Sequence, residues 1–156
     1  MGRNTRAATA KVQAVGDAGA RAGLAAREQL TAGSLLAAML VRSANDACLA
    51  LAEHHSGSVE RFVERMNERA QRLALTGTHF ENPCGLDAPG HLSTASDLLR
   101  LGRFAAKFPS VAALAATPGL TIETRAGRRI ALRTTNALLG RLPGAMGLKS
   151  GYTAQA

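Results

Sequence analysis

The chain has 156 residues and a mass of 16.2 kDa, which is enough for one domain with its own core and too little for two. Apolar residues make up 46% and charged residues 19% of it, a balance that excludes a wholly disordered chain. The net charge of +8 admits an anionic partner, but the arginines are scattered, and the densest set alternates with glutamates on one expected helix without stacking aromatics. We therefore expect no nucleic acid among the partners.

Two kinds of targeting segment are not expected in this chain. It has no run of about 18 uncharged apolar residues, so the sequence predicts no transmembrane helix. Residues 1–11 contain basic side chains, but no apolar run follows them, so they do not have the pattern of a secretory signal.

The first half of the chain predicts helices separated by short polar breaks. Residues 1–23 are small and polar and include Gly16, Gly19 and Gly23, so we expect a loop or an irregular edge there. Thr31 is a suitable N-cap for a helix over 34–41. A polar break over 42–46 precedes a mostly buried helix over 47–55. Ser58 then caps the clearest amphipathic helix, whose apolar residues recur every three or four positions: Val59, Phe62, Val63, Met66, Ala70 and Leu73.

The second half begins with a long loop and ends in strands. Residues 76–92 are rich in turn residues, and connecting loops of this length are often functional. Ser93 or Thr94 caps a helix that ends before Pro109, and a short helix over 110–116 follows. Segments 120–125 and 128–134 flank Ala126-Gly127, which is typical of a β-hairpin, and 146–153 is expected to form a third strand. Helices followed by strands predict an α+β fold, with a helical lobe beside a sheet.

Cysteine and histidine patterns predict neither a metal nor a cofactor. Cys48 and Cys84 are far apart with no CxxC motif, and the four histidines show no ligand spacing. The two cysteines are either free thiols or, in an oxidising compartment, a disulfide pair.

Two short polar motifs stand out from apolar surroundings. Ser43-Ala44-Asn45 places a hydroxyl and an amide between two expected helices, although the tripeptide alone is most simply a helix cap. Lys149-Ser150-Gly151 lies in an expected strand, where an ammonium beside a hydroxyl suits recognition of a carboxylate and the glycine allows close approach of a ligand. A lysine that protects a sheet edge is the simpler alternative for the second motif.

The pair of motifs is more specific than either motif alone. Serine acyltransferases combine S-x-x-K, S-x-N and K-T-G, and the second and third are present here, with Ser150 in place of the threonine. The similarity extends over 35–52 (LLAAMLVRSANDACLALA), 57–70 (GSVERFVERMNERA), 78–101 (THFENPCGLDAPGHLSTASDLLRL) and 134–153 (TTNALLGRLPGAMGLKSGYT). In these segments the chain resembles the serine-type D-alanyl-D-alanine carboxypeptidases, the low-molecular-mass penicillin-binding proteins of peptidase family S11.

The resemblance implies a β-lactamase/transpeptidase-like fold and hydrolysis of the terminal D-Ala from peptidoglycan stem peptides through an acyl-enzyme. Within that mechanism, Ser43 matches a serine that relays a proton toward the leaving amine. Asn45 matches the amide that orients the substrate and the catalytic lysine. The resemblance further implies a location in the cell envelope for the full-length protein and its inhibition by β-lactams.

The same resemblance assigns substrate binding to the second motif. Lys149 matches the cation of the cleft, and Ser150 matches the hydroxyl that binds the terminal carboxylate. Gly151 completes the motif, and the backbone N–H of Tyr152 matches one donor to the oxyanion.

The chain departs from the family pattern at the nucleophile. The residues three positions before its lysines are Ala8, Phe104 and Met146, so no S-x-x-K is present. We expect 12–156 to be part of a catalytic domain without the S-x-x-K region and the C-terminal strands, and we leave 1–11 unplaced. The chain by itself is then expected to be inactive and marginally stable, with an incomplete antiparallel sheet.

Three alternatives stay open at this point. A serine β-lactamase-like hydrolase shares the fold and motifs but needs a deacylating base. A binding domain would have kept the cleft and lost the nucleophile. A basic nucleic-acid binder is disfavoured by the charge pattern. An in-frame S-x-x-K upstream of Met1 would distinguish a truncated enzyme from the binding domain.

Overall fold

The computed structural model describes residues 7–9, for which only the backbone is considered, and residues 19–153. Its elements in chain order are strands β1 (Ala7–Thr9) and β2 (Gln29–Thr31), helices α1 (Ala32–Arg42), α2 (Asn45–Ser56), α3 (Val59–Arg72), α4 (Ala95–Ala105) and α5 (Pro109–Ala115), and strands β3 (Gly119–Glu123) and β4 (Arg129–Arg133). Strand β1 pairs with β2 and β3 pairs with β4, both antiparallel. Helices beside small antiparallel pairs confirm the expected α+β class.

The helices begin where the sequence places hydroxyl caps. The backbone N–H of Ser34 donates to Thr31 Oγ1 at 3.0 Å, and that of Arg61 donates to Ser58 Oγ at 3.2 Å. Of the two expected caps for α4, Thr94 is the one used, at 3.1 Å from the Asp97 N–H. The break between α1 and α2 is narrower than expected, because only two residues separate the helices.

The expected hairpin is present, whereas the structure differs from the expectations at two other places. Ile122 lies opposite Ile130 across β3 and β4, and buried and exposed residues alternate along β4. Within the part expected to be a loop or irregular edge, Ala7–Thr9 forms β1; three residues are too short to show an alternating pattern. Residues 146–153 form no strand, since the structure pairs their backbone with no neighbouring strand among the described residues.

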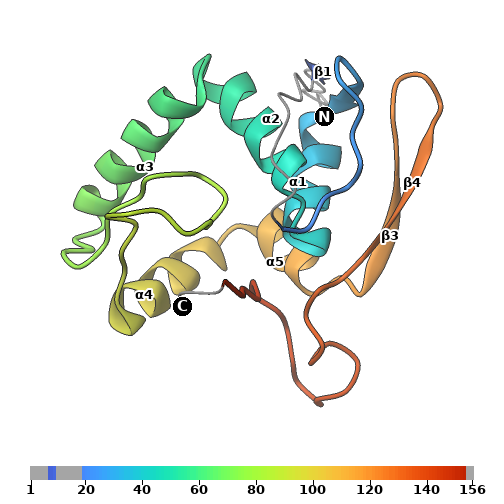
Figure 1. The fold of residues 1–156 in the computed structure, drawn as a ribbon. Coiled ribbons are helices and arrows are strands. Elements are labelled where there is room, and N and C mark those ends of the chain that lie inside the picture. Colours follow the sequence, from blue (N-terminus) through green and yellow to red (C-terminus); the bar gives the residue numbers. More distant parts are fainter. Residues whose placement is uncertain (1–6, 10–18, 154–156) are drawn as a thin grey trace.

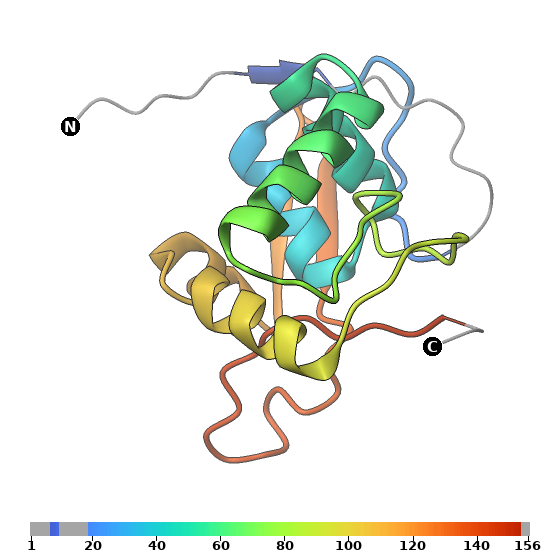
Figure 2. The same cartoon turned by 90° about the vertical axis from the view of Figure 1, so that its left-hand side faces the viewer.

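Helix α1 is the central element. It contacts α2, α5 and both strands of the hairpin, and Figure 1 shows it between the hairpin and the pair α2 and α3. In the turned view of Figure 2, the hairpin lies behind α1 and α2. The apolar core therefore lies between α1, α2 and the hairpin, and its largest buried members include Leu24, Leu30, Leu35, Val41, Ile122, Ile130 and Leu132.

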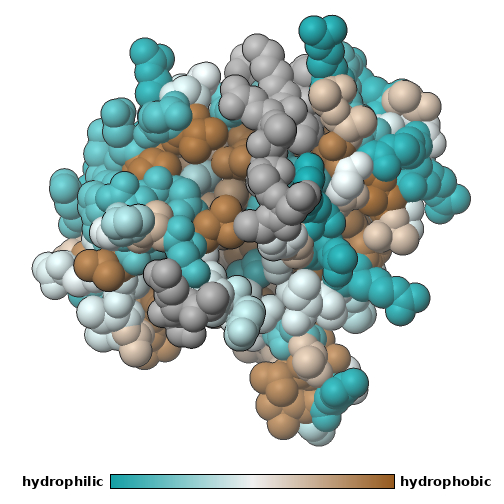
Figure 3. Space-filling model, viewed as in Figure 1, coloured by the Kyte–Doolittle hydropathy of each residue, from teal (hydrophilic) through white to brown (hydrophobic). Residues whose placement is uncertain are grey.

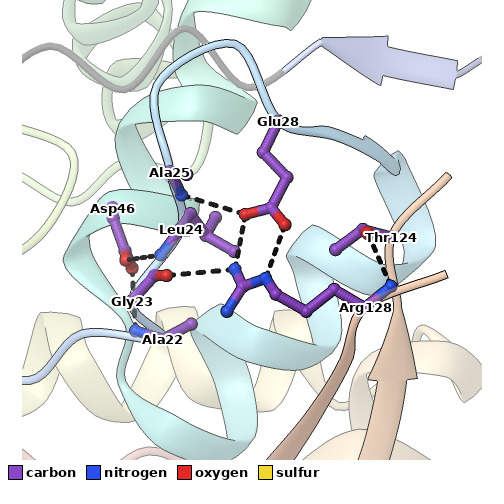
Figure 4. Close-up of polar contacts among 8 residues, drawn as sticks. All are labelled: Ala22, Gly23, Leu24, Ala25, Glu28, Asp46, Thr124 and Arg128. Carbon is purple, nitrogen blue, oxygen red and sulfur yellow. Dashed lines mark hydrogen bonds and ion pairs between the residues drawn. The ribbon is translucent and has the colours of Figure 1, made fainter. Parts of the chain in front are cut away.

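Two carboxylates fasten the segment before β2 to the rest of the molecule (Figure 4). Asp46, in the first turn of α2, is fully buried and accepts the backbone N–H groups of Ala22 and Leu24, each at 3.0 Å. Glu28 forms an ion pair with Arg128, at 2.7 Å between Oε1 and Nε and 2.5 Å between Oε2 and the guanidinium. The segment before β2 is thus held to α2 by Asp46 and to the hairpin by the ion pair of Glu28 with Arg128.

The segment after β4 is apolar and exposed. Leu138, Leu142 and Met146 are 56%, 55% and 79% exposed. Figure 1 shows this segment projecting below the hairpin, and apolar surface gathers on the projecting part in the same view of Figure 3.

Candidate active site

The first motif lies at the junction of the two central helices. Ser43 ends α1 in the left-handed region, with φ 59° and ψ 33°, a conformation that costs a non-glycine residue about 1–2 kcal/mol. The N–H groups of Ser43 and Ala44 both point back to the carbonyl of Ala38. The backbone of Ser43, and not its hydroxyl, therefore caps the end of α1. The hydroxyl projects from the junction and is available for other contacts.

The second motif meets this hydroxyl. Lys149 Nζ donates to Ser43 Oγ at 2.5 Å, across 106 positions of sequence, and also to the Ser150 carbonyl at 2.5 Å. The hydroxyls of Ser43 and Thr135 are 2.8 Å apart, and those of Thr135 and Ser150 are 3.0 Å apart. One ammonium and three hydroxyls therefore form a continuous hydrogen-bonded group.

The ammonium of this group is partly withdrawn from water. Burial lowers the pKa of Lys149 below its ordinary value, because a cation loses hydration there. Lys149 as a whole residue is nevertheless exposed, so the desolvation acts at the end that donates to Ser43 and Ser150. A desolvated cation beside hydroxyl donors is a suitable receptor for a carboxylate.

The other predicted site residues do not all join this group. Asn45 is 7% exposed, and its amide packs on Gly19, where a methyl group would come within 2.5 Å of Nδ2. Gly151 is exposed, and Tyr152 is 94% exposed. The structure therefore brings Ser43, Lys149 and Ser150 together, places Asn45 in the supporting layer, and leaves the roles of Gly151 and Tyr152 as predictions.

A broad hollow lies elsewhere on the described part of the chain. It measures about 680 Å³ and is lined by apolar and arginine side chains, mainly of α3, including Phe62, Met66, Arg69, Phe80 and Leu101. None of the motif residues lines it. We place the site at the hydrogen-bonded group, because chemistry depends on the convergent polar groups there rather than on volume. Within residues 7–9 and 19–153, no set of three or more histidine, cysteine or acidic side chains is arranged to hold a metal.

Comparison with known proteins decides the family. The profile of the family described as D-alanyl-D-alanine carboxypeptidase, Peptidase_S11, matches residues 5–156. The chain belongs to this family. The D-alanyl-D-alanine carboxypeptidase DacF of Bacillus subtilis (strain 168) is 36% identical over 129 residues, which are 83% of this chain and 33% of DacF.

Solved structures of the family share the fold. A D-alanyl-D-alanine carboxypeptidase from Mycobacterium tuberculosis H37Rv superposes with a TM-score of 0.84 at 35% identity, over 96% of this chain and 57% of that one. The S96A mutant of Streptomyces K15 DD-transpeptidase superposes with a TM-score of 0.86 at 26% identity, over 94% of this chain and 63% of that one. These similarities confirm the expected fold, and this S11 chain spans only part of each of these proteins.

Thr135 belongs to the hydrogen-bonded group, although the sequence did not predict it as a site residue. It follows β4, and its N–H donates to the carbonyl of Val41 at 3.2 Å, which fastens the hairpin to the end of α1 next to Ser43. Its only sequence signal is a position inside the family-like segment 134–153. The described helices of this S11 chain include none long and apolar enough to span a bilayer.

Proposed function

We propose that the protein to which these residues belong is a serine-type D-alanyl-D-alanine carboxypeptidase, and that the group formed by Ser43, Thr135, Lys149 and Ser150 binds the terminal carboxylate of its substrate. The contact that supports this proposal is the 2.5 Å hydrogen bond from Lys149 Nζ to Ser43 Oγ. It joins the two motifs whose combination distinguishes serine acyltransferases.

The proposed roles follow from the chemistry of each group. Lys149 supplies positive charge and Ser150 a hydroxyl donor to the carboxylate, because charge-assisted hydrogen bonds are about twice as strong as neutral ones. Ser43 sits between the ammonium and Thr135, so its hydroxyl can pass a proton toward the leaving amine. Asn45 orients the substrate and the catalytic lysine, and the backbone N–H of Tyr152 stabilises the oxyanion.

Membership of this family supports three further parts of the proposal: a location of the full-length protein in the cell envelope, peptidoglycan stem peptides ending in D-Ala-D-Ala as substrates, and β-lactams as inhibitors. The acylated nucleophile belongs to an S-x-x-K motif, which the 156 residues do not contain. We therefore expect the chain to bind its substrate without hydrolysing it.

Binding and turnover can be measured separately on the chain as it stands. With diacetyl-L-Lys-D-Ala-D-Ala, we expect no release of D-Ala above background. Chemical shifts of Ser43, Lys149 and Ser150 should report weak binding, and the same peptide with a C-terminal amide should bind at least roughly tenfold more weakly. Lys149→Met should remove the preference for the carboxylate.

Lys107→Met is the matched control, since Lys107 is an exposed lysine just after α4, and it should leave binding unchanged. Equal binding of the acid and the amide would contradict the carboxylate role. Release of D-Ala by the chain alone would contradict the requirement for the missing motif.

A binding domain without catalysis is the second candidate, since the group formed by Ser43, Thr135, Lys149 and Ser150 can hold a carboxylate without a nucleophile. A gene whose reading frame upstream of residue 1 encodes S-x-x-K, and whose longer product releases D-Ala, supports the enzyme. A longer product that binds the peptide but releases no D-Ala supports the binding domain.

A further inference from the structure

The two cysteines of the chain meet behind the first motif. Cys48 lies in α2 and is 5% exposed, whereas Cys84 lies on the loop 76–92 and is half-buried. The Cys84 thiol donates to the carbonyl of Asn45 at 3.8 Å, three residues before Cys48 on the same helix. Asn45 and Cys48 lie about one turn apart on α2, so this contact brings Cys84 beside the turn of α2 that carries Cys48, and both cysteines are free.

The loop holds Cys84 in this place by its own hydrogen bonds. Asn82 Oδ1 accepts the N–H groups of Cys84 and Leu86 at 3.1 and 3.0 Å, and Asn82 Nδ2 donates to the Leu86 carbonyl at 2.8 Å. A β-bridge between His79 and Leu92 closes the base of the loop. The fold therefore sets the distance between the thiols, which lie on separate elements.

We propose that Cys48 and Cys84 form a redox-active dithiol site, which an external disulfide compound converts into an intramolecular disulfide bond. The Cys84 thiolate attacks the external disulfide, a mixed disulfide forms on Cys84, and one thiolate leaves. Cys48 then loses its proton and attacks the Cys84 sulfur, which releases the second thiolate. In sum, two cysteine thiols are oxidised by two electrons and one external disulfide is reduced to two thiols.

The environments of the two cysteines assign their order in this exchange. Cys84 is the more accessible sulfur, so it meets the external disulfide first. Contact with Cys84, together with burial, raises the pKa of the Cys48 thiol. Since the thiolate is the attacking species, closure by Cys48 should become faster as the pH rises.

The bond would connect the loop 76–92 to the first turns of α2. Asn45 begins that helix, and Ser43 lies two residues before it. Oxidation would thus fix the layer that supports the candidate active site. This inference does not depend on the proposed function, because it concerns thiol chemistry alone.

The test is an equilibrium in mixtures of reduced and oxidised glutathione, followed by an acid quench, alkylation with N-ethylmaleimide and mass spectrometry. The oxidised chain should be a monomer that carries no N-ethylmaleimide and is two hydrogen atoms lighter than the reduced, unalkylated chain. Peptide mapping should locate the bond between Cys48 and Cys84. At one glutathione ratio, the disulfide-to-dithiol ratio should be at least roughly tenfold higher in the native chain than in concentrated guanidinium chloride, because only the fold keeps the thiols together.

Variants separate the contributions of the loop. Asn82→Ala keeps both cysteines but removes the hydrogen bonds that orient Cys84, so the native ratio should fall several-fold toward the denatured value. Asp87→Asn changes an exposed side chain of the same loop and should leave the ratio unchanged. The proposal is overturned if the native and denatured ratios are equal, or if glutathione remains on Cys84 without closure.

Discussion

Ser43 combines two properties that the sequence presents as alternatives. The tripeptide alone suggests a helix cap, and the residue does end α1, but through its left-handed backbone rather than through its hydroxyl. The hydroxyl instead contacts Lys149 and Thr135. A strained backbone at a point where polar groups converge is typical of functional sites.

Replacing Ser43 tests this strain directly. Ser43→Ala and Ser43→Gly both remove the hydroxyl that holds the Lys149 ammonium, so both should weaken the preference for a peptide carboxylate to the same extent. Only glycine adopts the left-handed conformation without a steric cost, so Ser43→Gly should be more stable than Ser43→Ala by roughly 1 kcal/mol. Urea denaturation of the two variants measures the difference. Equal stabilities would show that the left-handed turn stores no strain.

The meeting of Ser43, Lys149 and Ser150 follows from the pairing of their motifs, so it could be predicted from the sequence. The part played by Thr135 could not, because a threonine after a strand has many possible roles, and only the 3.2 Å bond to the Val41 carbonyl places it in the group. The burial of Asn45 against Gly19 likewise depends on a loop whose course no local pattern encodes.

At the scale of elements, short sequence signals correctly predicted the structures that form through contacts between neighbouring residues. Hydroxyl caps, the amphipathic pattern of α3 and the Ala126-Gly127 turn are all contained within a few residues, and each is observed. The pair β1 and β2 depends on a partner about twenty positions away, and 146–153 has strand composition without a paired neighbour. Whether each segment forms a strand was therefore decided by the presence of a partner strand distant in the sequence, and not by the β-propensity of its residues.

The ion pair that joins the β2 segment to the hairpin predicts a dependence of stability on pH. Hydrogen bonding from Arg128 lowers the pKa of the Glu28 carboxyl below its ordinary value of 4.5. The ion pair therefore stabilises the fold fully above that value, and its contribution is lost as the pH falls through the lowered folded-state pKa. Glu28→Gln should cost about 1–3 kcal/mol at neutral pH and flatten the acid side of the stability curve.

Glu68→Gln is the matched control, because Glu68 pairs with Arg72 at 3.1 Å on the exposed face of α3. Exposed pairs contribute little, so this variant should change the free energy of unfolding by at most about 0.5 kcal/mol. Urea denaturation from neutral pH down to about pH 3 compares the two. An unchanged acid limb in Glu28→Gln would rule out Glu28 as the group that titrates.

At the scale of the whole molecule, the exposed apolar segment after β4 should limit solubility. Leu138, Leu142 and Met146 are each more than half exposed, and burying such a side chain is worth about 1.5–3 kcal/mol. We expect the isolated chain to self-associate in sedimentation velocity at micromolar concentrations. Replacing all three residues by glutamine should shift it toward the monomer. A monomeric wild-type chain with a cooperative thermal transition would contradict this expectation.

The contact between Lys149 and Ser43 spans 106 positions, and this separation has a consequence for folding. Loop-closure entropy opposes such a contact until most of the chain is in place, whereas each helix, and the hairpin by itself, forms from residues close together in the sequence. On a ribosome, the receptor for the carboxylate would be assembled last, after the framework that surrounds it. A nascent chain that ends before position 149 has the framework but cannot hold a ligand.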